Sequence, residues 1–180
     1  RYTFIYNNIK LTKARTAQYF RGSIENSGAF LALLNSNQTF SQDPETNQYL
    51  ALGVPYAQYV KLDFDFRNFA NLSAEHQVVT RAFIGTTINY GNSPYLPPFE
   101  KSFFAGGSND IRGWTAYHLG PGNFPKYLYS FQGSNFAAVA PIKLLGSIEY
   151  RFPILKSLKG ALFVDAGNIG VRKEDPTRAG

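Results

Sequence analysis

Apolar and polar residues alternate along several stretches of the chain, as they do in β-strands whose two faces meet different surroundings. In the clearest stretch, residues 59–67, the apolar face holds Val60, Leu62, Phe64 and Phe66, and the polar face holds Tyr59, Lys61, Asp63, Asp65 and Arg67. Similar alternation predicts six strands, near residues 1–8, 18–28, 57–68, 77–90, 143–153 and 160–169. The pattern therefore predicts an all-β, antiparallel protein.

The connections between these strands alternate in length. Short turns are expected near residues 8–17, 68–76 and 153–159, and long irregular stretches near 28–57, 91–142 and from 169 to the end. Outer-membrane barrels have this order, with short periplasmic turns, long external loops, an apolar face toward lipid and a polar lumen. Long structureless loops argue against a compact soluble domain. We therefore expect an up-and-down transmembrane β-barrel in the outer membrane.

Composition narrows the possibilities further. The 180 residues include no Cys and no Met, two His, and 18 basic against 12 acidic residues that are scattered along the chain. This composition excludes cysteine chemistry, and without a basic stripe no nucleic-acid partner is expected. No metal site and no cofactor are expected. Because the smallest bacterial barrels have about eight strands, we expect this chain to be a section of a longer barrel.

One loop concentrates unusual residues. Residues 99–122, FEKSFFAGGSNDIRGWTAYHLGPG, hold the only tryptophan of the chain and five glycines; we call this segment the motif loop. Its core, from Phe103 to Trp114, resembles the signature of the BamA/TamA superfamily of outer-membrane insertases and translocation pores, roughly aromatic-x-x-Gly-Gly followed by Ile/Val-Arg-Gly-aromatic. The segments Gly146–Pro153 and Phe163–Asn168 resemble the two strands that follow that loop in the family. The Gly-Pro-Gly of residues 120–122 most resembles the TamA-like members of Bacteroidetes-type bacteria.

The resemblance implies a barrel of about sixteen strands preceded by periplasmic POTRA domains, with residues 1–180 forming part of the C-terminal barrel domain. It also implies that residues 91–142 fold into the lumen, where Arg112 pairs with the wall carboxylates Glu149 and Asp165 as a structural latch. The other motif residues are Gly106, Gly107, Ile111, Gly113 and Trp114. Strand parity points the same way, because Glu149 and Asp165 both fall on polar faces of neighbouring strands.

The implied function is non-enzymatic assembly, insertion or translocation of polypeptides in the outer membrane. The expected partners are outer-membrane lipids and lipopolysaccharide, client outer-membrane or secreted polypeptides, and accessory assembly proteins. A barrel fused to a lipase-like catalytic domain is an alternative, and it predicts a Gly-x-Ser-x-Gly motif upstream of residue 1. A soluble carbohydrate-binding β-sandwich is another, and it predicts that the phenylalanines of residues 59–67 pack inward on a second sheet.

Five side chains carry expectations of their own. Asp63 and Asp65 share a strand face and could form a glycosidase pair, but Lys61 and Arg67 in the same row favour simple charge balance. His76 and His118 lie near predicted turns or loops and are expected to be solvated. Trp114 is expected to pack rather than to stack on a ligand.

Overall fold

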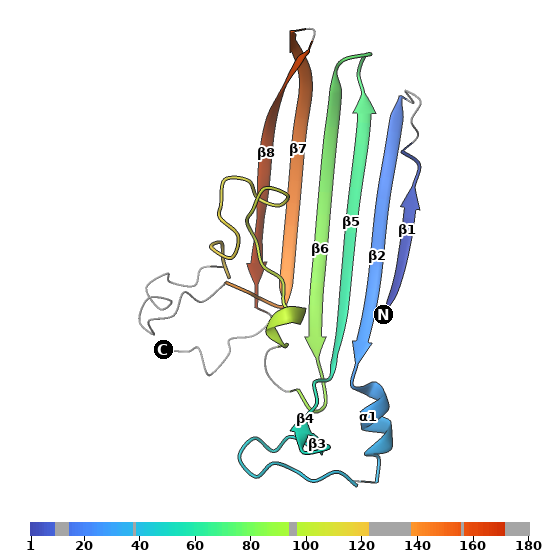
Figure 1. The fold of residues 1–180 in the computed structure, drawn as a ribbon, viewed down its shortest axis with the longest axis vertical. Coiled ribbons are helices and arrows are strands. Elements are labelled where there is room, and N and C mark those ends of the chain that lie inside the picture. The colour runs from blue at the N-terminus through green and yellow to red at the C-terminus, as the bar shows by residue number, and fades with distance from the viewer. Residues whose placement is uncertain (10–14, 38, 94–96, 123–137, 156, 172–180) are drawn as a thin grey trace.

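A computed structural model describes residues 1–9, 15–37, 39–93, 97–122, 138–155 and 157–171. Its main feature is a six-stranded antiparallel sheet in the order β1-β2-β5-β6-β7-β8 (Figure 1). The strands are β1 (Tyr2–Asn7), β2 (Thr16–Ser27), β5 (Tyr59–Asn71), β6 (Gln77–Asn89), β7 (Ile142–Leu155) and β8 (Leu158–Gly170). The prediction of an all-β, antiparallel protein is confirmed, and β1 and β8 are the edge strands of the described sheet.

The two hairpins β5–β6 and β7–β8 extend further than the sequence suggested. β5 continues to Asn71, three residues past the predicted end, and β7 continues through Pro153 to Leu155. The sequence predicts a turn that begins at Pro153, but its Cα lies opposite Lys159 in the β7–β8 ladder, with a register shift between Pro153 and Leu155. Proline is tolerated in a sheet beside such an irregularity, so it does not end the strand here.

The sheet has one apolar face and one polar face, as the alternation predicts. The apolar face includes Phe64, Ile84, Ile148 and Val164, and Val164 is 72 % exposed. The described part of the chain contains no second sheet packed on this face, because the only other sheet is the two-stranded β3–β4 hairpin. The soluble sandwich alternative is therefore wrong, since it required these side chains to be buried between sheets.

Short and long connections lie at opposite ends of the sheet (Figure 1). The long stretch after β2 is not wholly irregular, because it holds helix α1 (Ala29–Leu34) and a hairpin of β3 (Leu50–Ala51) and β4 (Val54–Pro55). Helix α1 is the apolar run AFLALL, and it begins after Gly28, whose φ is 73°. None of the helices in the described residues is long and apolar enough to cross a membrane.

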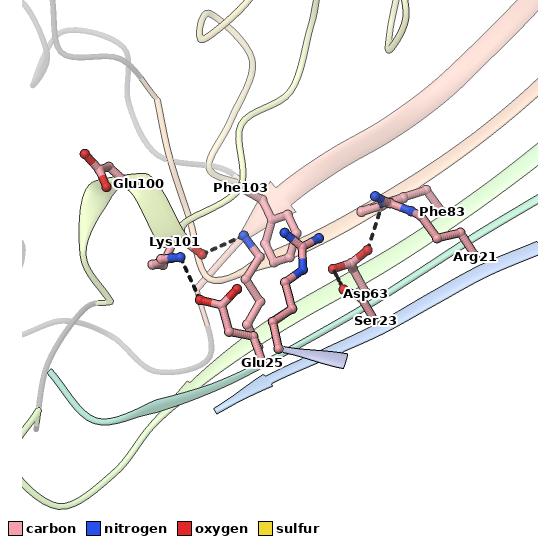
Figure 2. Close-up of a pocket in the computed structure, with 10 residues that line it drawn as sticks. Arg21, Ser23, Glu25, Asp63, Phe83, Glu100, Lys101 and Phe103 are labelled. Carbon is pink, nitrogen blue, oxygen red and sulfur yellow. Dashed lines mark hydrogen bonds and ion pairs between the residues drawn. The ribbon is translucent and has the colours of Figure 1, made fainter. Parts of the chain in front are cut away.

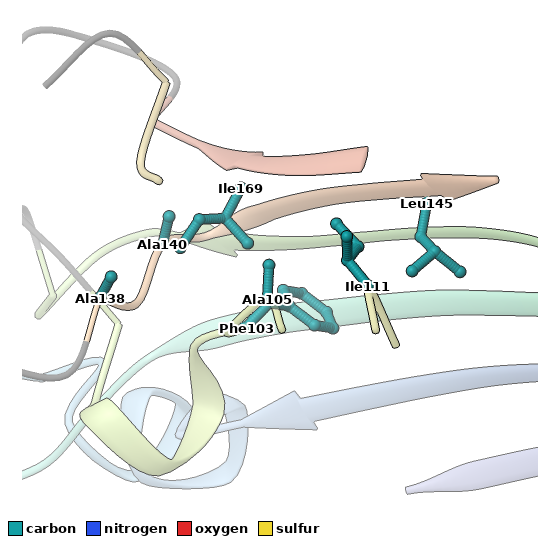
Figure 3. Close-up of a cluster of buried hydrophobic side chains, with 7 residues drawn as sticks. All are labelled: Phe103, Ala105, Ile111, Ala138, Ala140, Leu145 and Ile169. Carbon is teal, nitrogen blue, oxygen red and sulfur yellow. The ribbon is translucent and has the colours of Figure 1, made fainter. Parts of the chain in front are cut away.

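A small core lies between the motif loop and the polar face of the sheet (Figure 3). It consists of the buried side chains Phe103, Ala105, Ile111, Ala138, Ala140, Leu145 and Ile169. Phe103 and Ala140 exchange two backbone hydrogen bonds of 2.8 Å, which tie the loop to the residues before β7. Gly85 of β6 makes room for this packing, because a Cβ there would lie 2.5 Å from the Phe103 ring. The loop is thus packed on the wall rather than extended from the end of the sheet.

Candidate functional site

The motif loop lies on the polar face of the sheet, beside β7 and β8 (Figure 1). It turns back on itself through backbone hydrogen bonds from Asp110 to Gly107, from Trp114 to Ile111 and from Gly107 to Trp114, of 3.0, 3.1 and 2.8 Å. Gly106 and Gly107 have φ of 99° and 103°, a region that L side chains rarely adopt. A Cβ on Gly106 would also lie 2.3 Å from the Thr115 carbonyl oxygen. The paired glycines are therefore required by the fold of the loop.

Two other motif residues are less tightly enclosed. A Cβ on Gly113 would meet no atom within 4 Å, and its φ is not in the left-handed region, so the bend of the loop does not require a glycine there. Trp114 is 41 % exposed, so its ring is only partly packed. The tight part of the loop is the Gly-Gly pair, whereas Gly113 and Trp114 lie on its open side.

The structure brings Arg112, Glu149 and Asp165 together. The Arg112 Nε and Nη2 atoms donate to the two carboxylate oxygens of Asp165, both at 2.8 Å, and the Arg112 backbone N–H donates to Oδ2 at 3.1 Å. The third guanidinium nitrogen, Nη1, donates to Glu149 Oε2. β7 and β8 place both carboxylates on the face that the loop covers, because Ser147 pairs with Asp165 and Glu149 with Phe163 in the ladder. We refer to Arg112, Glu149 and Asp165 as the Arg112 latch.

The latch is largely shielded from water. The Asp165 and Glu149 side chains are 4 % and 14 % exposed, and Arg112 is 24 % exposed. The hydrogen bonds to Asp165, followed by those to Glu149, raise the pKa of the Arg112 guanidinium above its already high ordinary value. Arg112 therefore stays charged, and its charge is neutralised by bidentate pairing, the strongest geometry for an arginine and a carboxylate.

An aromatic ring adds a contact that the sequence reasoning missed. The Arg112 guanidinium carbon lies 3.5 Å from the centroid of the Phe163 ring, within range of a cation–π interaction. Phe163 precedes Asp165 by two residues on β8, so it lies on the same face. The same parity that identified Asp165 could have identified Phe163.

Two further basic residues of the wall hold the motif loop. Lys143 at the start of β7 binds Asp110 Oδ1 at 2.9 Å and the Phe104 carbonyl at 2.7 Å. The other Asp110 oxygen accepts the Gly106 N–H at 2.8 Å, so one carboxylate links the wall to the Gly-Gly turn. Arg81 of β6 donates to the Asn109 carbonyl at 2.6 Å. The sequence reasoning assigned no role to these residues, and strand position alone contains no signal for their partners.

Asp63 and Asp65 are both neutralised by arginines. Asp65 accepts hydrogen bonds from Arg67 and Arg81, each with an Nη2–Oδ2 distance of 2.9 Å. Asp63 accepts from Arg21 at 2.9 Å and from the Ser23 hydroxyl (Figure 2). Charge balance rather than a glycosidase pair therefore describes both carboxylates.

Lys61 lies in the same row, and its hydrogen bond goes to the motif loop. Its Nζ donates to the Lys101 carbonyl at 3.0 Å and lies 4.2 Å from the Phe103 ring centroid. Lys101 in turn binds Glu25 at 2.6 Å, and this hydrogen bond raises the pKa of the Lys101 amine. These groups line a cavity of about 260 Å³ on the polar face (Figure 2). The cavity extends the charged lining of the sheet from β7 and β8 toward β2.

The two histidines have different surroundings. His118 is exposed, as expected, but His76 is half-buried. Its Nδ1 lies 2.7 Å from the Tyr150 hydroxyl, and the two rings stack with centroids 5.8 Å apart. The expectation of a solvated His76 is therefore wrong, because β6 and β7 bring Tyr150 next to the β5–β6 turn. Among the described residues, no group of three or more His, Cys, Asp or Glu side chains could hold a metal ion.

Part of the predicted loop 91–142 lies outside the described residues, namely 94–96 and 123–137. The described remainder contains the whole motif loop and its contacts with the wall. A family model described as the Omp85 superfamily domain matches residues 27–180. The matched region includes β5 to β8, the motif loop and all three residues of the Arg112 latch.

Proposed function

The chain belongs to the Omp85 superfamily, a family of outer-membrane protein insertion and translocation, and we propose that it acts as a barrel of BamA/TamA type. In this proposal it assembles or translocates client polypeptides mechanically and makes or breaks no covalent bond. Its partners are client polypeptides, accessory assembly proteins, and the lipids and lipopolysaccharide around its apolar face. The closer likeness to TamA-like members stays a prediction.

The observation that supports this proposal is the Arg112 latch. A loop arginine that binds carboxylates of two adjacent strands, β7 and β8, ties the loop to both of them. Removing one partner of such a shielded pair leaves an uncompensated charge, at a cost of about 3–5 kcal/mol. We propose that the Arg112 latch, because it is this costly to break, keeps the β7–β8 wall and the loop in place while client strands enter elsewhere by β-augmentation.

The loop is also held independently of the latch. Lys143 of β7 binds Asp110 and Arg81 of β6 binds the Asn109 carbonyl, so two wall strands contact the loop besides the Arg112 latch. Substituting Arg112 should therefore loosen the loop and the β7–β8 wall without unfolding the whole sheet. The proposal thus predicts a loss of function that is larger than the loss of folded protein.

The test is Arg112→Ala in the full-length protein, compared with Arg151→Ala. Arg151 also donates to Glu149, but it is exposed and its other hydrogen bond goes to Gln77 rather than to the loop. We expect Arg112→Ala to lower the temperature at which the folded band is lost on unheated gels, and to lower the level of folded client proteins. Arg151→Ala should change neither by a comparable amount. Unchanged values for Arg112→Ala, or equal losses for both variants, would contradict the proposal.

The absence of bond chemistry is itself part of the proposal. It is supported by the pairing of Asp63 and Asp65 with arginines, which leaves neither carboxylate placed as a free acid or base. The competing function, a barrel that anchors a lipase-like domain, predicts fatty-acid release from phospholipid vesicles by the purified full-length protein. Such release would refute this part of the proposal while leaving the role of the Arg112 latch open to its own test.

A further inference from the structure

A second site lies at the opposite side of the structure from the short turns, where the long connections gather (Figure 1). A cavity of about 470 Å³ opens between the end of α1, the residues on either side of the β3–β4 hairpin and the residues that follow β6. Its lining includes Asn35, Asn47, Gln48, Gln58, Tyr49 and Tyr56, and we call it the amide cavity. Its volume falls within the roughly 300–1,000 Å³ of small-molecule sites.

Hydrogen bonds within the protein already hold the walls of the amide cavity in place without a ligand. Asn92, which is buried, accepts the Tyr49 N–H at 2.6 Å and donates to the carbonyls of Tyr49 and Tyr56 at 2.9 and 3.0 Å. Its backbone N–H donates to Gln58 Oε1 at 2.7 Å, and its carbonyl accepts from Gln48 Nε2 at 2.8 Å. One residue thus fastens the β3–β4 segment to the end of β6. A site held in this way loses little entropy on binding.

These fastening bonds use only one end of each amide. The opposite ends, Gln48 Oε1 and Gln58 Nε2, make no hydrogen bond within the described residues. The same holds for Asn35 Nδ2, since only its Oδ1 is used, by the Phe40 N–H at 2.8 Å. Gln58 is buried and lines the cavity, so a ligand in the cavity could accept a hydrogen bond from its unused Nε2 donor. The cavity therefore presents both donors and acceptors that a ligand could satisfy.

The chemistry of this lining selects a ligand class. None of the lining residues named above is charged, so the cavity has no counter-charge for a phosphate or a carboxylate. Amides both donate and accept hydrogen bonds, as sugar hydroxyls do, and tyrosine rings combine an apolar face with a polar edge. The Tyr56 ring is held edge-on by Phe40 at a centroid distance of 6.1 Å. Tyrosine rings beside unused amides suit the apolar faces and hydroxyl groups of a neutral sugar.

We propose that the amide cavity binds a neutral oligosaccharide. In a barrel of the outer membrane, the end with long connections faces the outside of the cell, where the cavity would meet such glycans. This inference does not rest on the latch or on client assembly, because it uses none of the residues of the polar face. A saccharide carried on an outer-leaflet glycolipid and a free saccharide present the same chemistry to the cavity.

The experiment is calorimetric titration of the full-length protein, kept in a polyoxyethylene detergent so that no sugar headgroup competes. The probes are maltotriose, cellotriose and mannotriose, with trigalacturonate as the charged comparison and a neutral, flexible tripeptide as the other class of ligand. A parallel titration with lipopolysaccharide vesicles, with and without the polysaccharide chain, distinguishes a membrane-borne source from a free one. We expect saturable binding of at least one neutral saccharide and none of trigalacturonate.

Variants locate the binding. Tyr49→Ala removes a ring but leaves the two backbone bonds to Asn92, and Asn47→Gly removes an amide at a position whose φ of 56° glycine accepts. Each should weaken binding about tenfold or more. Leu52→Ala, at the exposed tip of the same hairpin and outside the named lining, is the matched control and should bind normally. Absence of saturable saccharide binding in the millimolar range would overturn the proposal. So would binding of only the tripeptide or the acidic sugar, or binding that these two variants leave unchanged.

Discussion

The two carboxylates of the Arg112 latch should contribute unequally to stability. Asp165 accepts three hydrogen bonds from Arg112, two of them from the guanidinium in parallel, and its side chain is 4 % exposed. Glu149 accepts one hydrogen bond from Arg112, shares its other oxygen with Arg151, and is 14 % exposed. We therefore predict that Asp165→Asn destabilises the protein more than Glu149→Gln does.

The magnitudes follow from these contacts. Asp165→Asn removes the charge that faces the guanidinium and leaves Arg112 with a single carboxylate, which should cost about 3–5 kcal/mol. Glu149→Gln leaves the bidentate pair with Asp165 intact, so the cost should be that of one charged hydrogen bond, about 1.5–3 kcal/mol at most. A difference of about 2 kcal/mol corresponds to roughly 30-fold in the unfolding equilibrium. Because both residues share Arg112, the loss in the double variant should differ from the sum of the losses in the two single variants.

The assay is urea unfolding of the full-length protein refolded into lipid vesicles, followed by tryptophan fluorescence and by the loss of the fast-migrating folded band on unheated gels. Agreement between the two probes supports a single transition, which the free energies require. Glu75→Gln is the matched control, because Glu75 lies exposed in the β5–β6 turn and its carboxylate has no partner in the described residues. It should stay within about 0.5 kcal/mol of the parent protein.

Equal effects of Asp165→Asn and Glu149→Gln would refute the reasoning, because the count and shielding of the hydrogen bonds would then not decide the energy. A larger effect of Glu149→Gln would refute it as well. Strict additivity in the double variant would show that the two carboxylates do not act through a shared arginine. Each outcome is readable from the same set of unfolding curves.

Two other predictions concern the seat of the motif loop. Gly85→Ala should destabilise the protein by about 1–3 kcal/mol, because the new Cβ would lie 2.5 Å from the Phe103 ring. Gly146→Ala should be nearly neutral, because its Cβ would meet no atom within 4 Å. Thermal unfolding of both variants checks this prediction, and equal effects would contradict it. The hydrogen bond to Glu25 raises the pKa of Lys101. The contribution of this ion pair to the stability of the fold is therefore complete below the ordinary lysine pKa of about 10.4, and it is lost as pH rises through the raised pKa. The stability difference between the parent protein and Lys101→Met should therefore shrink at strongly alkaline pH, and a constant difference across that range would contradict this.

Alternation along the chain was enough to determine the strands and their two faces. Whether a residue of a strand faces one way or the other depends only on its parity, which is a local property of an extended backbone. Residues 59–67 show this directly, since Phe64 and Phe66 are exposed on one face and Asp63 and Asp65 are buried on the other. Glu149 and Asp165 could be placed on one face by the same reasoning, before any partner was known.

Strand ends and loop structure were less accessible from the sequence. A proline at residue 153 suggested a turn, but the ladder continues past it because pairing with β8 outweighs the local signal. The stretch 28–57 looked irregular, yet it contains α1 and the β3–β4 hairpin. Their arrangement depends on Asn92, which joins residues separated by 36 or more positions in the chain.

What the sequence alone determined is therefore the two-faced antiparallel sheet and the carboxylates that line it. The tertiary structure decided which groups meet across the motif loop: Lys143 with Asp110, Arg81 with Asn109, and Arg112 above Phe163. These contacts join residues 28 to 51 positions apart. No periodicity extends across such a loop, because its path is set by the packing of Phe103 and Ile111 on the wall and not by local backbone geometry.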